Sequence, residues 1–512
     1  MSIDTQQSAL NVEQVQGIFS LYSAGRFNEA LENANALLRA YPDEGILHNL
    51  AGLINAAMLQ YEPAIASLRR AIELKPDVAD THYFLGNTLL QKGDAAEALE
   101  YFERAIELRP DYVEAHSKLC EGLERSNRLE ELEQALARAQ ERCPGAHPAL
   151  ALREAELMKR KGDFENARAR LEGSAWQAAD DDTRETAAYL LCDLCDRLDA
   201  TDQAFAYAEE ANRITRDTLA VSRIDPNAYL ALVDELQRAF ENIDVSAWQT
   251  VRVDDGRDDP VFIVGFPRSG TTLLNTILQT HGAFQVVEEV STVYRVESEL
   301  RKSASGYAQG LVGLDADSIA KLRRAYFHEL DAHIPPHEQA SIIVDKLPLN
   351  MTHAGLIHRV FPGARFLFAQ RHPCDAVLSC FMRNFAMNEA MVNCTELAGA
   401  VKLYDRVMTL WQLYRDRLPL AVHTVRYESL IADFDATMAK TLEFLGVEWD
   451  DNIRQFMETE INRGRIGTPS YNQVTEDIYT AASGRWTRYR DHLEAVLPEL
   501  LPWAERMGYP GE

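Results

Sequence analysis

The chain has 512 residues, of which 46% are hydrophobic and 26% are charged, and its formal net charge is −27 at pH 7. Its length suggests about three or four domains, and its composition excludes a disordered or fibrous protein. The negative charge argues against a general affinity for nucleic acid or for an anionic membrane surface, because both favour basic proteins.

The N-terminal residues MSIDTQQSALNVEQ are polar and acidic, without the basic and apolar regions of a secretory signal. No uninterrupted apolar stretch approaches the length that spans a bilayer. The seven cysteines have no disulfide-like spacing. Cys192 and Cys195 are spaced as C-x-x-C but lie in a helical pattern, so we expect them to be buried rather than metal-binding. These features predict a cytoplasmic protein.

A repeat with a period of 34 residues occupies the N-terminal part of the chain. The recurring residues are Pro42, Pro76, Pro110 and Pro144, with Ala30, Ala64 and Ala98 upstream. Each unit is predicted to form two amphipathic helices, with a break such as Gly93-Asp94 between them and proline ending the second.

The repeat resembles the tetratricopeptide repeat, whose length and A-x-x-x-F element it matches at Ala98 and Phe102. This resemblance implies an α-solenoid over residues 11–215, with a concave face that holds a peptide, a protein partner or a substrate. A spacer or a dimerising arm is the alternative. Residues 216–257 are predicted to form a helical linker, and residues 258–512 a second domain.

The second domain begins with VFIVGFPRSGTTLL, in which a buried strand is followed by a turn and a helix. This pattern predicts an α/β domain of P-loop type with a mainly parallel sheet. Backbone N–H groups and the helix dipole would form an anion site at the turn. The spacing of Gly265 and Gly270 matches G-x-x-x-x-G-K-[ST], but Thr271 stands in place of the lysine.

The absent lysine argues against a P-loop kinase or NTPase, which needs it together with Mg²⁺. A sulfuryl group carries less negative charge than a phosphoryl group, so side-chain cations and hydrogen-bond donors can support its transfer without metal. PRSGTT resembles the 5′-phosphosulfate loop of sulfotransferases that use 3′-phosphoadenylyl sulfate (PAPS). The resemblance implies donor contacts from Arg268, Ser269, Gly270, Thr271 and Thr272.

The next segment, QVVEEVSTVYRV, supplies the candidate general base. Tyrosylprotein and heparan sulfotransferases use a glutamate just past the first helix, which this resemblance places at Glu289, with Glu288 as the alternative. The tyrosylprotein enzymes carry an arginine two positions further on. This chain has Ser291 there and an arginine only at Arg295, so recognition of an acidic tyrosine-containing peptide is not implied.

Two further strands end in candidate cations. IIVDKLPLN ends a strand at Lys346, which by resemblance stabilises charge as the bond to sulfur breaks. FLFAQ ends at Arg371, and a helix then carries Ser379. The family uses such a pair for the 3′-phosphate of the donor, because a dianion favours a guanidinium and a hydroxyl in fixed geometry.

The C-terminal segments resemble the remainder of the family's donor site. RYESL implies that Tyr427 lies beside the adenosine of PAPS, and TPSYNQVTEDIYTAASGRWTRY implies phosphate contacts from Ser470 and Arg485, with Trp486 packing beneath them.

These resemblances together imply a PAPS-dependent sulfotransferase that releases adenosine 3′,5′-bisphosphate, in which Glu289, Lys346 and Arg268 are catalytic. The acceptor is a hydroxyl group, and protein tyrosine, a polysaccharide and a small metabolite all stay open. A P-loop kinase or NTPase, or a repeat scaffold with an inert nucleotide-binding domain, are the alternatives.

Overall fold

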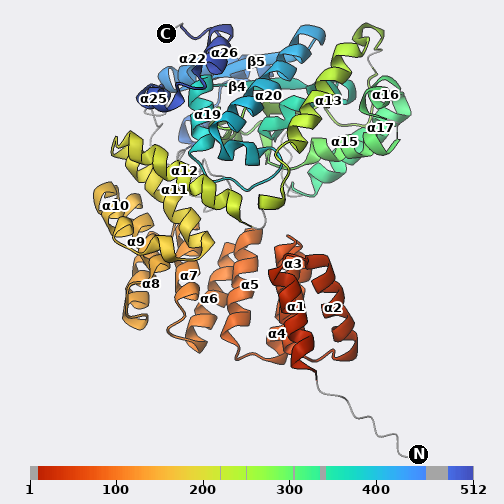
Figure 1. Ribbon diagram of the computed structural model, residues 1–512. Helices are drawn as coiled ribbons and strands as arrows, with labels where there is room; N and C mark the ends of the chain where they lie inside the picture. Colours follow the sequence, from red (N-terminus) through yellow and green to blue (C-terminus); the bar gives the residue numbers. More distant parts are fainter. Residues whose placement is uncertain are drawn as a thin grey trace, which may run out of the picture. The chain divides into compact units, whose positions relative to one another are not determined.

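The computed structural model describes residues 10–218, 221–248, 251–303, 306–334, 342–456 and 483–510. These residues form two compact units (Figure 1). The first, the repeat unit, covers residues 10–200, and the second, the sheet unit, covers residues 201–217 and the described residues from 221 to 510. Among all these residues, no helix is both long and apolar enough to cross a membrane.

In the repeat unit, helices adjacent in sequence pack side by side (Figure 1). They are α1 (Val12–Ser23), α2 (Phe27–Ala40), α3 (Gly45–Ala57), α4 (Tyr61–Leu74), α5 (Ala79–Lys92), α6 (Ala95–Leu108), α7 (Val113–Arg125), α8 (Leu129–Arg142), α9 (Pro148–Arg160), α10 (Phe164–Glu172) and α11 (Asp181–Arg197).

Small residues allow the paired helices to approach closely. A Cβ on Gly86 would lie 2.8 Å from the ring of Phe102, so only glycine fits beside that ring. Ala98 and Phe102 are fully buried, and α6 ends at Leu108, shortly before Pro110. The A-x-x-x-F element and the periodic proline therefore act as predicted. Cys192 is buried as well.

The turns between paired helices place one residue in the left-handed region in successive repeats. The residues are Gly25 (φ 66°), Leu59 (φ 59°), Gly93 (φ 100°) and Asn127 (φ 54°). Glycine and asparagine adopt this conformation readily, whereas for other residues it costs about 1–2 kcal/mol. Leu59 is thus strained, and it is also 70% exposed.

Replacing Leu59 with glycine is expected to raise the free energy of unfolding by about 0.5–1 kcal/mol, because the strain relieved exceeds the added freedom of the unfolded chain. The urea midpoint of the repeat unit measures this gain. Leu59→Ala, which removes the exposed side chain but keeps the Cβ, should show no comparable gain. Gly93→Ala should lower the stability, because alanine is strained in the left-handed conformation of this residue. A Cβ there would meet nothing within 4 Å, so the loss would come from the backbone and not from a clash. Equal stability of the glycine and alanine variants at position 59 would contradict this account.

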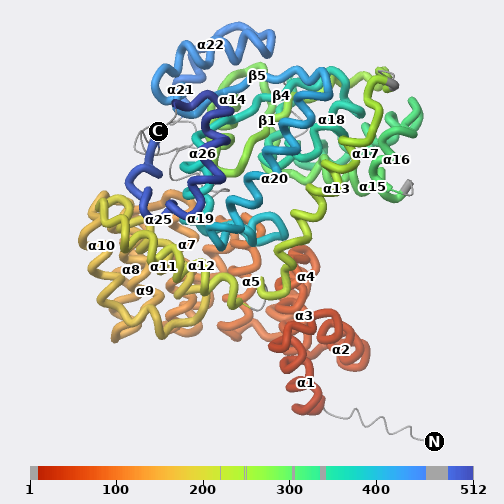
Figure 2. The backbone as a smooth tube through the Cα atoms, turned by 45° about the horizontal axis from the view of Figure 1, so that its top comes forward, coloured from red at the N-terminus to blue at the C-terminus, as the bar shows by residue number. Residues whose placement is uncertain are grey.

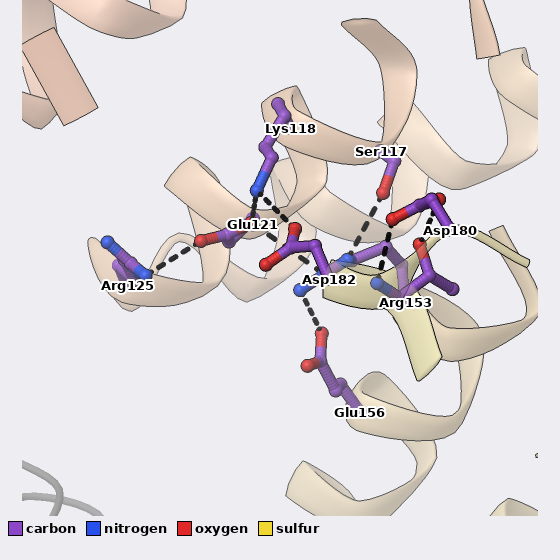
Figure 3. A network of polar contacts seen from close by, with 9 residues as sticks. Ser117, Lys118, Glu121, Arg125, Arg153, Glu156, Asp180 and Asp182 are labelled. Carbon is purple, nitrogen blue, oxygen red and sulfur yellow. Dashed lines mark hydrogen bonds and ion pairs between the residues drawn. The ribbon is translucent and has the colours of Figure 1, made fainter. Parts of the chain in front are cut away.

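A charge network with a buried centre joins the later helices of the repeat unit (Figure 3). Arg153 on α9 lies 2.8 Å from Glu156 and 3.6 Å from Glu121 of α7. Lys118 contacts Glu121 at 2.9 Å and Asp182 of α11 at 3.2 Å. Burial alone would raise the pKa of Glu121, but the surrounding cations hold it at about 2. The network therefore links α7, α9 and α11 through paired charges.

The sheet unit contains five parallel strands in the order β2-β3-β1-β4-β5. Their bounds are β1 (Val261–Val264), β2 (Phe284–Glu288), β3 (Ile342–Lys346), β4 (Arg365–Gln370) and β5 (Ala421–Arg426). In register, Val261 of β1 lies opposite Val344 of β3 and Arg365 of β4. Strands alternate with helices along the chain, as parallel pairing requires.

Helices cover both faces of this sheet (Figure 2). Val261 and Ile263 face a core formed with α14 (Thr271–Gln279) and α22 (Phe434–Leu445). Phe262, on the opposite face, contacts the rings of Tyr326 and Phe361. The other helices of the unit are α12 (Thr201–Asp217), α13 (Ala228–Asn242), α15 (Thr292–Ser303), α16 (Tyr307–Val312), α17 (Ala316–Asp331), α18 (Ala354–Val360), α19 (Pro373–Phe381), α20 (Leu397–Arg417), α21 (Tyr427–Ala432), α25 (Arg490–Leu493) and α26 (Leu497–Arg506).

The predicted fold class, an α-solenoid followed by an α/β domain with a parallel sheet, is confirmed. Helix α12 packs within the sheet unit, where Asn212 donates a hydrogen bond to the carbonyl of Phe381 at 2.8 Å. The domain limits at residues 215 and 257 remain predictions.

Candidate active site

Each of the five strands ends at a residue that the sequence assigns to the site. The assignments are the loop 265–270 after β1, Glu288 and Glu289 at the end of β2, Lys346 at the end of β3, Arg371 after β4 and Tyr427 after β5. Because all strands are parallel, these carboxyl ends meet at one edge of the sheet, where ligands bind in open α/β folds.

The two glycines of the loop are required by the protein's own packing. A Cβ on Gly265 would lie 2.5 Å from the carbonyl oxygen of Ala369 in the neighbouring strand β4. Gly270 has a φ of 95°, and its Cβ would lie 2.8 Å from the ring of Tyr427. A Cβ at either position would therefore clash with the protein itself, whether or not a phosphate approaches the loop.

Arg268 lies at the centre of the loop and contacts the two residues predicted for the 3′-phosphate. Its Nε donates to Ser379 Oγ at 3.1 Å, and its carbonyl accepts a hydrogen bond from Arg371 Nη1 at 3.0 Å. Arg268 has a φ of 67°, an unfavourable conformation for arginine that persists only where the surroundings enforce it. Three residues from separate motifs are thus brought together.

The remaining loop residues begin helix α14. Ser269 and Thr271 are buried, and Thr272 is half-buried in the first turn of the helix. Arg371 places its guanidinium over the ring of Tyr427, with its Cζ 5.0 Å from the ring centroid. Tyr427 therefore packs against both the loop and the arginine that follows β4.

Four arginines gather around this loop. Burial, together with the guanidinium groups of Arg383, Arg371 and Arg485, lowers the pKa of Arg268 to about 9. Guanidinium groups form charge-assisted and often bidentate hydrogen bonds with phosphate oxygens. The donor set therefore fits a multiply charged anion such as a nucleotide that carries two phosphate groups.

Arg383 was missed by the sequence prediction. It follows Ser379 by four residues, a spacing that places side chains on one face of a helix, and this was the available signal. Its role could not be inferred from that spacing alone, because α19 ends at Phe381 and the orientation of the next residues depends on tertiary packing.

Asp375, also missed, holds the C-terminal segment against α19. Its two carboxylate oxygens accept hydrogen bonds from the backbone N–H groups of Gly484 and Trp486, each at 2.8 Å. This bidentate contact places Arg485, between them, in the arginine cluster. Trp486 is buried, as predicted. Ser470 lies outside the described residues.

The candidate base and the candidate lysine are in direct contact. Lys346 Nζ lies 2.7 Å from Oε1 of Glu288 and 2.7 Å from Oε1 of Glu289. The lysine side chain is fully buried, whereas the two carboxylates are 38% and 44% exposed. Glu289 has a φ of 55°, and its N–H donates to the carbonyl of Lys346 at 2.7 Å. One buried cation thus faces two accessible carboxylates.

Comparison with known proteins agrees with these features. Residues 260–451 match the model of the Sulfotransferase family, and three overlapping stretches between residues 20 and 147 match the tetratricopeptide repeat. The chain therefore carries tetratricopeptide repeats followed in sequence by a sulfotransferase-family domain, which confirms both predicted resemblances.

Its relatives include an uncharacterized protein of Aquifex aeolicus (strain VF5), 22% identical over 86% of this chain but 57% of the relative. The protein-tyrosine sulfotransferase A of Caenorhabditis elegans is 25% identical over 51% of this chain and 70% of its own. The protein-tyrosine sulfotransferase 2 of Gallus gallus is 25% identical over 49% of this chain and 69% of its own.

Among solved structures, the sulfotransferase domain from the curacin biosynthetic pathway covers 50% of this chain and all of its own. It has 17% sequence identity and a TM-score of 0.34. In the described part of the chain, no group of three or more His, Cys, Asp or Glu side chains is arranged to hold a metal ion.

Proposed function

We propose that the chain transfers a sulfuryl group from PAPS to a hydroxyl group of an acceptor and releases adenosine 3′,5′-bisphosphate. The observation that carries this proposal is the buried arginine cluster around Arg268, at the same sheet edge as the Lys346–Glu289 pair. The arginine cluster would bind the anionic donor. In the Lys346–Glu289 pair, the carboxylate would accept a proton and the ammonium group would stabilise the negative charge that develops on the leaving oxygen. The match to the sulfotransferase family supports the same reaction.

The donor would be held at both ends of its nucleotide. Residues 268–272 and the start of α14 face the 5′-phosphosulfate, whereas Arg371 and Ser379 hold the 3′-phosphate. Arg383 and Arg485 add positive charge, and Tyr427 supports the loop from beneath Gly270. The donor supplies an activated sulfuryl group; the protein supplies its orientation and neutralises its charge.

Glu289 is the proposed general base. Lys346 Nζ lies 2.7 Å from the carboxylate of Glu289 and orients it, and the exposure of that carboxylate gives an acceptor hydroxyl access to it. As Glu289 takes the proton, its attraction for Lys346 weakens, and the ammonium group is released to stabilise the oxygen that leaves sulfur. Glu288 holds the same ammonium group at rest and is the alternative base.

The acceptor is proposed to be a large molecule, a protein or a glycan, recruited by the repeat unit directly or through a partner protein. Two relatives that match about half of this chain are named protein-tyrosine sulfotransferases, which favours tyrosine hydroxyls. Ser291, however, stands where we expect those enzymes to carry an arginine, so an acidic sequence around the tyrosine is not part of the proposal.

Thermal unfolding with nucleotides tests the donor site. Adenosine 3′,5′-bisphosphate should raise the Tm of the sheet unit, because a ligand at 100 times its Kd stabilises by about 2.7 kcal/mol. Adenosine 5′-monophosphate, which lacks the 3′-phosphate, should have a much smaller effect. A larger shift with ATP and Mg²⁺ would favour a kinase or NTPase instead.

A second experiment identifies the class of acceptor. The protein is incubated with a cell extract and ³⁵S-labelled PAPS, and the size fraction that takes up the label is then determined.

A further inference from the structure

A fully buried carboxylate next to Lys346 has no part in the proposed reaction. Asp345 occupies the penultimate position of β3, and because side chains alternate along a strand, it points to the sheet face opposite Lys346. Its Oδ2 accepts hydrogen bonds from Thr292 Oγ1 at 2.6 Å and from Tyr326 OH at 2.8 Å. Its Oδ1 lies 3.3 Å from Asn350 Nδ2.

The three donors to this carboxylate are neutral. Burial raises the pKa of Asp345 to about 6, although the hydrogen bonds from Thr292 and Tyr326 act in the opposite direction. A carboxylate buried among neutral partners is costly for folding. The geometry of its contacts indicates what this group does.

Thr292 is the first residue of α15 and follows Glu289 by three positions. The segment from Glu289 to Thr292 is therefore fastened to β3 at both ends. At one end the Glu289 N–H donates to the carbonyl of Lys346, and at the other the Thr292 hydroxyl donates to Asp345. Two successive residues of β3 hold the short segment that carries the proposed base.

Glu289 itself is in the left-handed region, at φ 55°. This conformation costs a residue with a Cβ about 1–2 kcal/mol and persists only where neighbouring contacts enforce it. Without the contact at Thr292, the segment is held to β3 at its Glu289 end alone, through the backbone and side chain of Lys346, and Glu289 is able to relax to an ordinary backbone conformation. Its carboxylate would then leave the position beside Lys346.

We infer that Asp345, acting through the hydroxyl of Thr292, is a positioning residue that holds Glu289 beside Lys346 in a strained conformation. The inference rests on the proposed function, in which Glu289 takes the proton of the acceptor. It assigns to Asp345 a task that is separate from donor binding, since the arginine cluster belongs to other strand ends.

Three substitutions test this assignment. Thr292→Val removes the hydroxyl at nearly constant volume and is expected to lower kcat about 10- to 100-fold, the range that a small misplacement of a reacting group produces. The Kd for adenosine 3′,5′-bisphosphate should not change. Thr292→Ser restores the hydroxyl and should restore most of kcat. Tyr326→Phe removes a donor to the same oxygen of Asp345 from α17, and its kcat should stay within about threefold of the unaltered protein.

Parallel losses of kcat in Thr292→Val and Tyr326→Phe, each following the loss of Tm, would overturn the inference and leave Asp345 a structural residue. A crystal structure of Thr292→Val gives a readout that needs no activity. In that structure Glu289 should leave the left-handed region and separate from Lys346. If Glu289 does not move, the contact between Thr292 and Asp345 does not position it, and the inference is wrong. Failure of the unaltered protein to transfer sulfate from PAPS would instead count against the proposed function.

Discussion

Replacing Glu289 with glutamine is expected to lower the rate of sulfuryl transfer by about 10²- to 10⁴-fold, the usual effect of removing a general base. The amide keeps the size of the carboxylate but cannot accept the proton of the acceptor hydroxyl. The Kd for adenosine 3′,5′-bisphosphate, measured by calorimetry, should stay within about twofold, because Glu289 contacts Lys346 and not the arginine cluster.

Glu288→Gln is the matched control, since both carboxylates lie 2.7 Å from the same ammonium group. It should reduce the rate far less, because the contact with Lys346 and the left-handed backbone of Glu289 both remain. A greater loss with Glu288→Gln would make Glu288 the base. Full activity of the protein with both substitutions combined would exclude a carboxylate base at this strand end.

Replacing Arg268 with glutamine is expected to stabilise the ligand-free protein and to abolish its response to adenosine 3′,5′-bisphosphate. Burial, together with the neighbouring guanidinium groups, lowers the pKa of Arg268 from its ordinary value to about 9 in the folded protein. The unfolded state thus binds this proton more tightly, so the buried charge opposes folding at neutral pH. Loss of the hydrogen bond to Ser379 offsets part of the gain, leaving about 1 kcal/mol, or about 2–4 °C in Tm.

The pH dependence of this difference provides a second measurement. Below pH 9 Arg268 is charged in both the folded and the unfolded state, and the destabilisation of the folded protein by this buried charge is fully present. Above pH 9 the folded protein releases the proton, so the advantage of Arg268→Gln should shrink as pH rises. Arg454→Gln, at an exposed arginine, should alter neither Tm nor nucleotide binding. A lower Tm for ligand-free Arg268→Gln would show that the arginine supports the fold.

Much of the candidate site could be predicted because it follows from strand ends. Three of the buried strands are recognisable in the sequence as VFIVG, IIVDK and FLFAQ. Parallel pairing brings the residues that follow these strands to one edge of the sheet, independently of the conformation of the intervening segments. Lys346 and Arg371 were predictable for this reason, and so was the loop that carries Arg268.

The residues that were missed act through contacts between distant segments. Asp375 binds the backbone of Gly484, more than one hundred positions away, and no local pattern marks an aspartate for that task. Asp345 lies in the D-K-L-P segment, but its partners are the hydroxyls of Thr292 and Tyr326 on two other helices. The contact of Lys346 with both Glu288 and Glu289 likewise depends on the pairing of β2 with β3.

The arginine cluster has a consequence for turnover. PAPS and adenosine 3′,5′-bisphosphate carry the same two phosphate positions, so guanidinium groups that hold the one also hold the other. Once the sulfuryl group has been transferred to the acceptor, both phosphates of the product nucleotide still lie in the field of Arg268, Arg371, Arg383 and Arg485. Departure of that nucleotide is therefore expected to be a slow step of the proposed catalytic cycle.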